Sequence, residues 1–291
     1  MATTAGPLLF AMFVWWFSTG AVLYCVGRRA HTRPLLIAAA TLAAAGALYG
    51  LWVTSTDTSI TGAFVAFSCA LMVWAWHEVT FLTGTITGPR TSPLPGREGP
   101  ISNKPAPLSA AIETVIYHEA AIALTLALAV ILTSGGGNLT GLWTLVILWV
   151  MRLSAKFNLY LGVPNLTEQF LPDHLAYLKG YFCRRPMNLL FPVSVTGSTI
   201  ATVFLGLAAA APGASEFETV SYVLLATLLG LAVVEHWFMV VPLPSAELWS
   251  WGLSPRTHMA SQDRPAFERH DSSVFTAPGT GEKIRPAAIA S

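Results

Sequence analysis

The chain has 291 residues, of which 54% are hydrophobic and only 11% are charged, and its mean hydropathy is +0.58. Soluble domains carry about a quarter charged residues, so this composition excludes an ordinary soluble domain and indicates a multi-pass membrane protein. The formal net charge of +1 leaves no large single-sign field, which argues against a nucleic-acid partner.

Apolar windows of about 20 residues, long enough to cross roughly 30 Å of hydrocarbon, recur along the whole chain. They predict seven membrane-spanning helices, near residues 7–26, 34–53, 60–83, 110–133, 139–158, 189–211 and 219–241. The first has no basic segment before it and is long enough to span, so we expect a retained helix rather than a signal peptide. We therefore predict an all-α integral membrane domain over residues 1–253, followed by a polar, flexible cytoplasmic tail over 254–291.

The basic residues give the orientation of these spans. All sixteen Lys and Arg lie in the first, third and fifth connections with their flanks, or in the tail, and the other connections carry none. Because positive charge is retained in the cytoplasm, we expect a periplasmic N-terminus and a cytoplasmic C-terminus.

Two cytoplasmic connections have distinct patterns. The third, over residues 84–107, is rich in Pro, Gly, Ser and Thr, which predicts an irregular loop. In the fifth, Asn165 and Glu168 resemble a helix-capping box, and apolar residues recur at helical spacing; these are Leu171, Leu175, Leu178 and Phe182. We expect an amphipathic helix lying on the inner membrane face between the fifth and sixth spans.

Three histidine–glutamate pairs lie inside the predicted spans: His77–Glu78, His118–Glu119 and Glu235–His236. Ionisable groups are costly in hydrocarbon, so they usually face a protein interior and mark a function. Counted from the cytoplasmic ends of their spans, the three histidines lie roughly 9, 12 and 8 Å deep. A common depth on three helices predicts one convergent site.

Three imidazoles and three carboxylates suit iron, manganese or zinc, and could form a two-metal site with Glu113 as a further ligand. The spacing matches neither the Glu-x-x-His pattern of ferritin-like sites nor the His-x-x-x-His runs of membrane desaturases. A second interpretation is a polar network with Arg152, Lys156 and Asn158 that fixes helix packing. Ligation of a pigment such as bacteriochlorophyll by a single histidine, His77, His118 or His236, is a third, and a proton relay is a fourth. The tryptophans are interpreted as interfacial anchors or packing.

Four runs of sequence carry a family resemblance: HEVTFLTGTITGPR (His77–Arg90), IYHEAAI (Ile116–Ile122), Phe157–Phe182 and RRPMNLLFPVSVT (Arg184–Thr196). They resemble the PuhE family, also called photosynthetic complex assembly protein 2, and the likeness covers roughly residues 8–250. The resemblance implies the inner (cytoplasmic or intracytoplasmic) membrane of a phototrophic bacterium. It also implies a role in assembling the reaction centre and its antenna, with no settled biochemical activity.

Two functional hypotheses follow. The first is an assembly factor that binds reaction-centre or antenna subunits, or holds bacteriochlorophyll or another pigment during insertion. The second is a membrane metalloenzyme of oxidase or hydroxylase type, which would use a metal in the His/Glu layer to act on an apolar pigment, quinone or precursor.

Overall fold

The computed structural model describes residues 2–97, 101–166, 168–243 and 245–253. Within these ranges seven helices are long and apolar enough to cross a membrane, which confirms the predicted fold class. They are α1 (Ala2–Val26), α2 (Arg33–Thr54), α3 (Ile60–Leu82), α5 (Ile116–Thr133), α6 (Thr140–Leu161), α7 (Leu190–Ala209) and α8 (Glu216–Phe238). The described residues form no strand, only an isolated bridge between Val163 and Arg184. The predicted tail over 254–291 lies outside the described residues.

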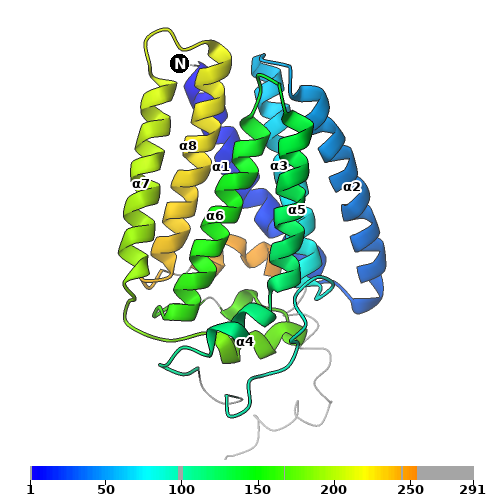
Figure 1. The fold of residues 1–291 in the computed structure, drawn as a ribbon, viewed down its shortest axis with the longest axis vertical. Helices are drawn as coiled ribbons and strands as arrows, with labels where there is room; N and C mark the ends of the chain where they lie inside the picture. The colour runs from blue at the N-terminus through cyan, green and yellow to red at the C-terminus, as the bar shows by residue number, and fades with distance from the viewer. Residues whose placement is uncertain (1, 98–100, 167, 244, 254–291) are drawn as a thin grey trace, which may run out of the picture.

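Helix α3 is the centre of the bundle, and it packs against α1, α2, α5, α6 and α8 (Figure 1). Its Phe67 is fully buried together with Ala11 of α1 and Leu224 of α8. Helix α6 approaches α2 and α3 closely at Gly141, where a Cβ atom would lie 2.3 Å from Leu51 Cδ2. Helix α7 is peripheral and packs against α8 and α6.

The fourth predicted span, over 110–133, is interrupted. A short helix α4 (Leu108–Glu113) ends before a break at Thr114 and Val115, and the membrane helix α5 begins only at Ile116. The break forms because the preceding loop packs against it: a Cβ on Gly88 would lie 2.1 Å from the Glu113 carbonyl oxygen. The Thr87 carbonyl then accepts the backbone N–H of His118 at 2.9 Å. His118 therefore lies in the first turn of its helix, not two turns inside it as predicted.

The amphipathic helix predicted in the fifth connection is also different in the structure. The chain forms two 3₁₀ segments, η2 (Glu168–Phe170) and η3 (Asp173–Tyr181), with Pro172 directly before η3. Asn165 makes no capping box, because its Nδ2 donates to the carbonyls of Phe238 and Val241 at 3.2 and 2.8 Å. Proline lacks an N–H and disfavours a helical residue before it, so one continuous α-helix is interrupted here.

The segment η3 closes one end of the bundle. Its Leu175 and Leu178 are buried in a cluster with Leu23 of α1 and with Val79 and Leu82 of α3. The apolar residues predicted at helical spacing thus pack onto the membrane helices themselves.

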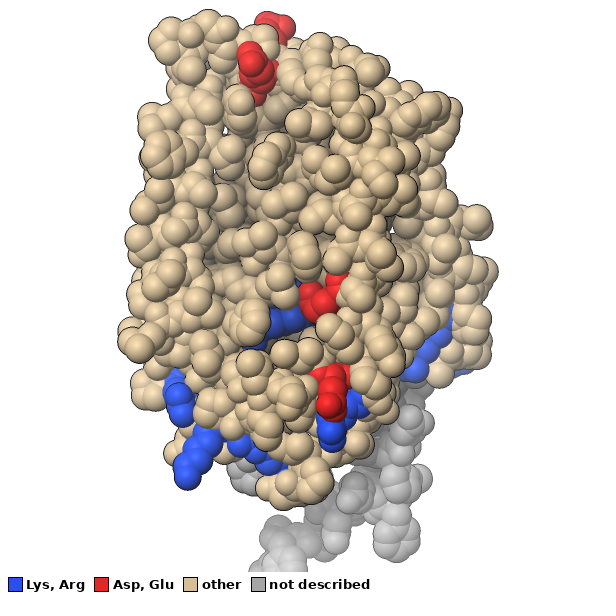
Figure 2. All heavy atoms as spheres, in the orientation of Figure 1, with Lys and Arg blue, Asp and Glu red and all other residues tan. Residues whose placement is uncertain are grey.

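Charge divides the bundle into two ends (Figure 2). Lys and Arg gather at the end that carries α4, and we call this the basic end. One of them, Arg90, pairs with Glu113 of α4. On the face shown, the opposite end carries acidic side chains and no basic ones, while acidic atoms also lie beside basic ones at the basic end. The surface between the two ends is uncharged except in a hollow between α5 and α6. An uncharged belt between charged ends is what a bilayer requires of a spanning protein.

Candidate functional site

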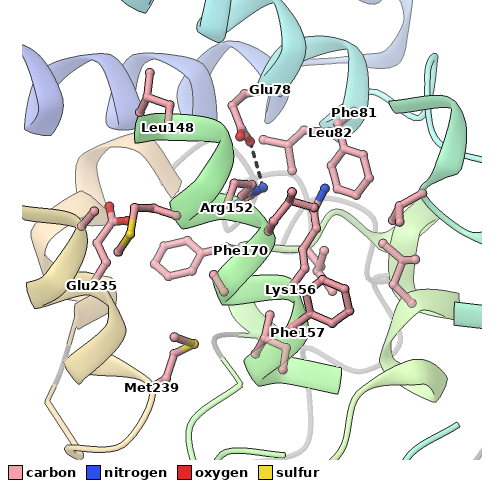
Figure 3. Close-up of a pocket in the computed structure, with 18 of the residues that line it drawn as sticks. Glu78, Phe81, Leu82, Leu148, Arg152, Lys156, Phe157, Phe170, Glu235 and Met239 are labelled. Atoms are coloured by element: carbon pink, nitrogen blue, oxygen red, sulfur yellow. Dashed lines mark hydrogen bonds and ion pairs between the residues drawn. The ribbon is translucent and has the colours of Figure 1, made fainter. Parts of the chain in front are cut away.

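A cavity of about 500 Å³ lies within the bundle, toward the basic end. Residues of α1, α3, α5, α6 and α8 line it, together with α4 and the 3₁₀ segments (Figure 3). Most lining side chains are apolar, for example Leu82, Leu148 and Phe170. The charged or titratable ones include Glu78, Glu119, Arg152, Lys156, Glu235 and His236. An apolar cavity of this size with a few placed polar groups is typical of a small-molecule site.

Two ion pairs connect α6 to its neighbours at this cavity. Arg152 Nη2 lies 3.0 Å from Glu78 Oε2 of α3, and Lys156 pairs with Glu119 Oε1 of α5. The two cations are four residues apart, so they lie on one face of α6. Trp149 Nε1 adds a 2.9 Å bond to Glu119 Oε2. The carboxylates of Glu78 and Glu119 are only 16% and 15% exposed, and pairing offsets the cost of removing them from water.

The third carboxylate, Glu235 of α8, has a different environment. Its Oε1 accepts a 2.8 Å hydrogen bond from Trp15 Nε1 of α1. Within the described residues Glu235 makes no ion pair, and its side chain borders the cavity. This carboxylate keeps acceptor capacity that the protein leaves unused.

The histidines are buried and largely engaged. His118 Nε2 donates to the His77 carbonyl at 3.2 Å, which leaves its Nδ1 to accept from Lys156 Nζ at 3.4 Å. His236 Nδ1 donates to the carbonyl of Ala232, and its Nε2 accepts from Ser154 Oγ, both at 2.8 Å. These contacts connect α3 to α5 and α6 to α8.

His77 is 1% exposed, and neither of its ring nitrogens has a hydrogen-bond partner among the described residues. Its ring lies 6.0 Å from that of His118 between centroids, but His77 is not among the residues that line the cavity. Among the three pigment-ligand candidates, the ring nitrogens of His118 and His236 are therefore engaged, and His77 does not line the cavity.

The structure connects the three His/Glu pairs through α6 without gathering them into one ligand set. No group of three or more His, Cys, Asp or Glu in the described part of the chain could hold a metal ion. The carboxylates are instead engaged by Arg152, Lys156 and an indole, so the donor set as it lies does not fit the predicted iron, manganese or zinc ion. Glu113 lies elsewhere, 2.7 Å from Arg90 at the end of α4.

The contacts match the polar-network interpretation for Arg152 and Lys156 but not for Asn158. Asn158 Nδ2 donates to the Ser154 carbonyl at 2.9 Å, and its Oδ1 accepts from Asn188 Nδ2 at 3.1 Å, away from the acidic residues. Sequence reasoning missed Trp15 and Trp149 as partners of carboxylates. For Trp149 a signal was present, because positions 149, 152 and 156 share one helical face.

Comparisons with known proteins identify relatives of this chain. Residues 1–260 match the model of a family described as "Protein of unknown function (DUF3623)". A protein of Rhodobacter capsulatus, named "Uncharacterized 30.4 kDa protein in puhA 5'region", is 40% identical over 257 residues, which is 84% of this chain and 89% of that protein. No solved structure matches the chain.

Proposed function

The chain belongs to the DUF3623 family, and we propose that it is a membrane-embedded assembly factor for the photosynthetic reaction centre and its light-harvesting complex. The Rhodobacter capsulatus relative is named for the puhA 5' region, which agrees with the photosynthetic setting that the resemblance to the PuhE family implies. A relative that is 40% identical over most of both chains supports the same setting for this one.

The structural observation that carries the proposal is the cavity inside the bundle. A protein that only anchors others in a membrane has no need of about 500 Å³ of apolar interior space with charged groups placed in its wall. Such a space suits temporary binding of a small apolar cofactor, or of part of a pigment such as bacteriochlorophyll without ligation by a histidine, while a complex is being built. The metalloenzyme alternative lacks comparable support, because no described contact favours it.

We further propose that the basic end faces the cytoplasm of a bacterial inner membrane, with the N-terminus in the periplasm. This orientation places η3 and the loop over residues 84–97 on the side where newly made reaction-centre or antenna subunits are inserted. Cysteine labelling tests this orientation. In a variant without the three native cysteines, Ser92→Cys puts a thiol in the loop over residues 84–97, at the basic end, and Ser134→Cys puts one after α5, at the opposite end of the bundle. An impermeant maleimide added to intact spheroplasts should label only Ser134→Cys.

The proposed function is tested by affinity capture of the full-length protein, expressed at its native level with a C-terminal tag. After a shift to conditions that induce photosynthetic complexes, reaction-centre or antenna subunits should be enriched at least about tenfold over a tagged, unrelated multi-pass protein. Equal recovery with both baits during active synthesis contradicts a role in assembly.

A further inference from the structure

The cavity opens sideways, between α5 and α6. Four apolar residues at its wall are also exposed: Leu108 and Ile112 of α4, Ile116 of α5 and Phe157 of α6, at 40–47% of their surface. Figure 2 shows acidic and basic atoms from outside at this level, in a hollow between α5 and α6. The charged residues of these two helices are Glu119, Arg152 and Lys156, and all three line the cavity.

Two other sides of the cavity are covered by 3₁₀ segments. On the α1 side, Trp249 Nε1 donates to the Trp16 carbonyl at 3.1 Å, and Trp16 Nε1 donates to the Leu248 carbonyl at 2.8 Å. These reciprocal bonds hold the 3₁₀ segment η4 (Ser245–Trp249) against α1. At the basic end, η3 buries Leu175 and Leu178 over the helix ends.

The charged part of the opening lies within the spanning helices α5 and α6. Lys156 is five residues before the end of α6, roughly 8 Å along the axis. A molecule passing between α5 and α6 therefore comes from the hydrocarbon of the leaflet at the basic end, and the exposed apolar rim matches that origin.

The polar wall specifies the chemistry of the occupant. Arg152 lines the cavity with a side chain that is 36% exposed. In the described part of the chain only its Nη2 has a hydrogen-bond partner, the carboxylate of Glu78. A guanidinium group has five N–H donors, so the accessible N–H groups of Arg152 can donate to a carbonyl oxygen of a ligand. Glu235, with one acceptor bond used, can take a hydroxyl or N–H from the same ligand.

We propose that the cavity binds a membrane-soluble molecule with an apolar chain and a carbonyl-bearing head, which enters from the bilayer between α5 and α6 and places a carbonyl at Arg152. The inference deepens the proposed function, since it names the class of molecule that the assembly factor would hold. The geometry of the cavity supports it independently of any partner subunit.

The test uses the full-length protein in lipid nanodiscs and decyl-benzoquinone as the probe, a ten-carbon chain on a dicarbonyl ring. Trp15, Trp74 and Trp249 line the cavity, so bound quinone should quench their fluorescence in a saturable manner. Decylbenzene, which has the chain but no carbonyl, should compete at least about tenfold more weakly.

Two variants locate the site. Arg152→Lys keeps a cation for Glu78 but removes the further guanidinium donors that would bind a carbonyl. It should weaken quinone binding about fivefold or more while leaving the affinity for decylbenzene unchanged. Ile112→Phe with Ile116→Phe narrows the opening and should slow quinone association about tenfold. The matched control is Leu124→Phe with Leu128→Phe. These two leucines of α5 are exposed, are also four residues apart and do not line the cavity, so this variant should bind quinone at the wild-type rate.

Quenching that only rises linearly with quinone, as in empty nanodiscs, overturns the proposal. Saturable binding that neither Arg152→Lys nor the narrowed opening alters overturns the assigned site and route. The binding test and the capture test can fail separately. Saturable quinone binding without capture of photosynthetic subunits would contradict only the assembly role. Capture of these subunits without saturable quinone binding would contradict only the ligand site.

Discussion

The ion pair between Lys156 and Glu119 provides a quantitative test of the polar layer. Substituting Lys156→Met keeps the length of the side chain but removes the cation beside Glu119. The two side chains are 21% and 15% exposed, so water screens the remaining charge poorly. Breaking a buried pair by removing one partner typically costs about 3–5 kcal/mol. We expect the lower end, about 3 kcal/mol, because Trp149 still donates to Glu119.

The free energy of unfolding is measured by reversible SDS titration in mixed micelles. The double variant Glu119→Gln with Lys156→Met removes both charges and should recover to within about 1 kcal/mol of wild type, since no unpaired charge remains. Glu113→Gln is the control, because it breaks an ion pair whose side chains are 32% and 44% exposed, outside the membrane helices. If Lys156→Met is no more destabilising than Glu113→Gln, the reasoning about the layer is wrong.

Three further predictions concern the packing around the site. Gly141→Ala should destabilise the bundle by about 1–3 kcal/mol in the same SDS titration, because its Cβ would lie 2.3 Å from Leu51 Cδ2, whereas Gly197→Ala, with open space around it, should not. Asn188→Ala should lower the free energy of unfolding by about 1–2 kcal/mol, because Asn188 Oδ1 accepts from the backbone N–H groups of Leu190 and Phe191 and Nδ2 donates to the Gly162 carbonyl. Asn188→Asp keeps the two acceptor bonds but loses the donor bond, so it should recover only part of this loss. Burial raises the pKa of the Cys183 thiol, which reduces its thiolate fraction near neutral pH. Maleimide should therefore modify Cys183 only after SDS has unfolded the protein, and labelling of the folded protein at the rate of a free thiol would contradict this burial.

The sequence predicted the spans well because the bilayer imposes one strong rule, an apolar length of about 20 residues for each helix. It failed where tertiary contacts decide local structure. The break at Thr114 depends on a loop that Gly88 brings against it, and the 3₁₀ form of 173–181 depends on Pro172 and on packing beneath the helices. The local apolar pattern contains neither contact.

For the site, the sequence predicted His/Glu pairs near one end of the spans and a polar network with Arg152 and Lys156, but not which carboxylate each cation contacts. Arg152 and Lys156 were predictable partners, because cations in a span seek carboxylates. The direction in which each carboxylate points depends on helix rotation, and Glu235 turns toward Trp15 of a helix 220 residues away in the sequence. The cavity forms where α1, α3, α5, α6 and α8 meet α4 and the 3₁₀ segments, an arrangement that no linear pattern encodes.

The most direct test is the absorption spectrum of membranes from a phototrophic bacterium that lacks this gene and is complemented with variants of the full chain. The account predicts that deletion lowers the absorption of assembled reaction-centre and antenna complexes. Wild type and the control Leu124→Phe with Leu128→Phe should restore it, and Ile112→Phe with Ile116→Phe, expressed at the same level, should not. Unchanged complex absorption in the deletion strain would contradict the assembly function, and full restoration by the narrowed variant would contradict a role for the lateral opening.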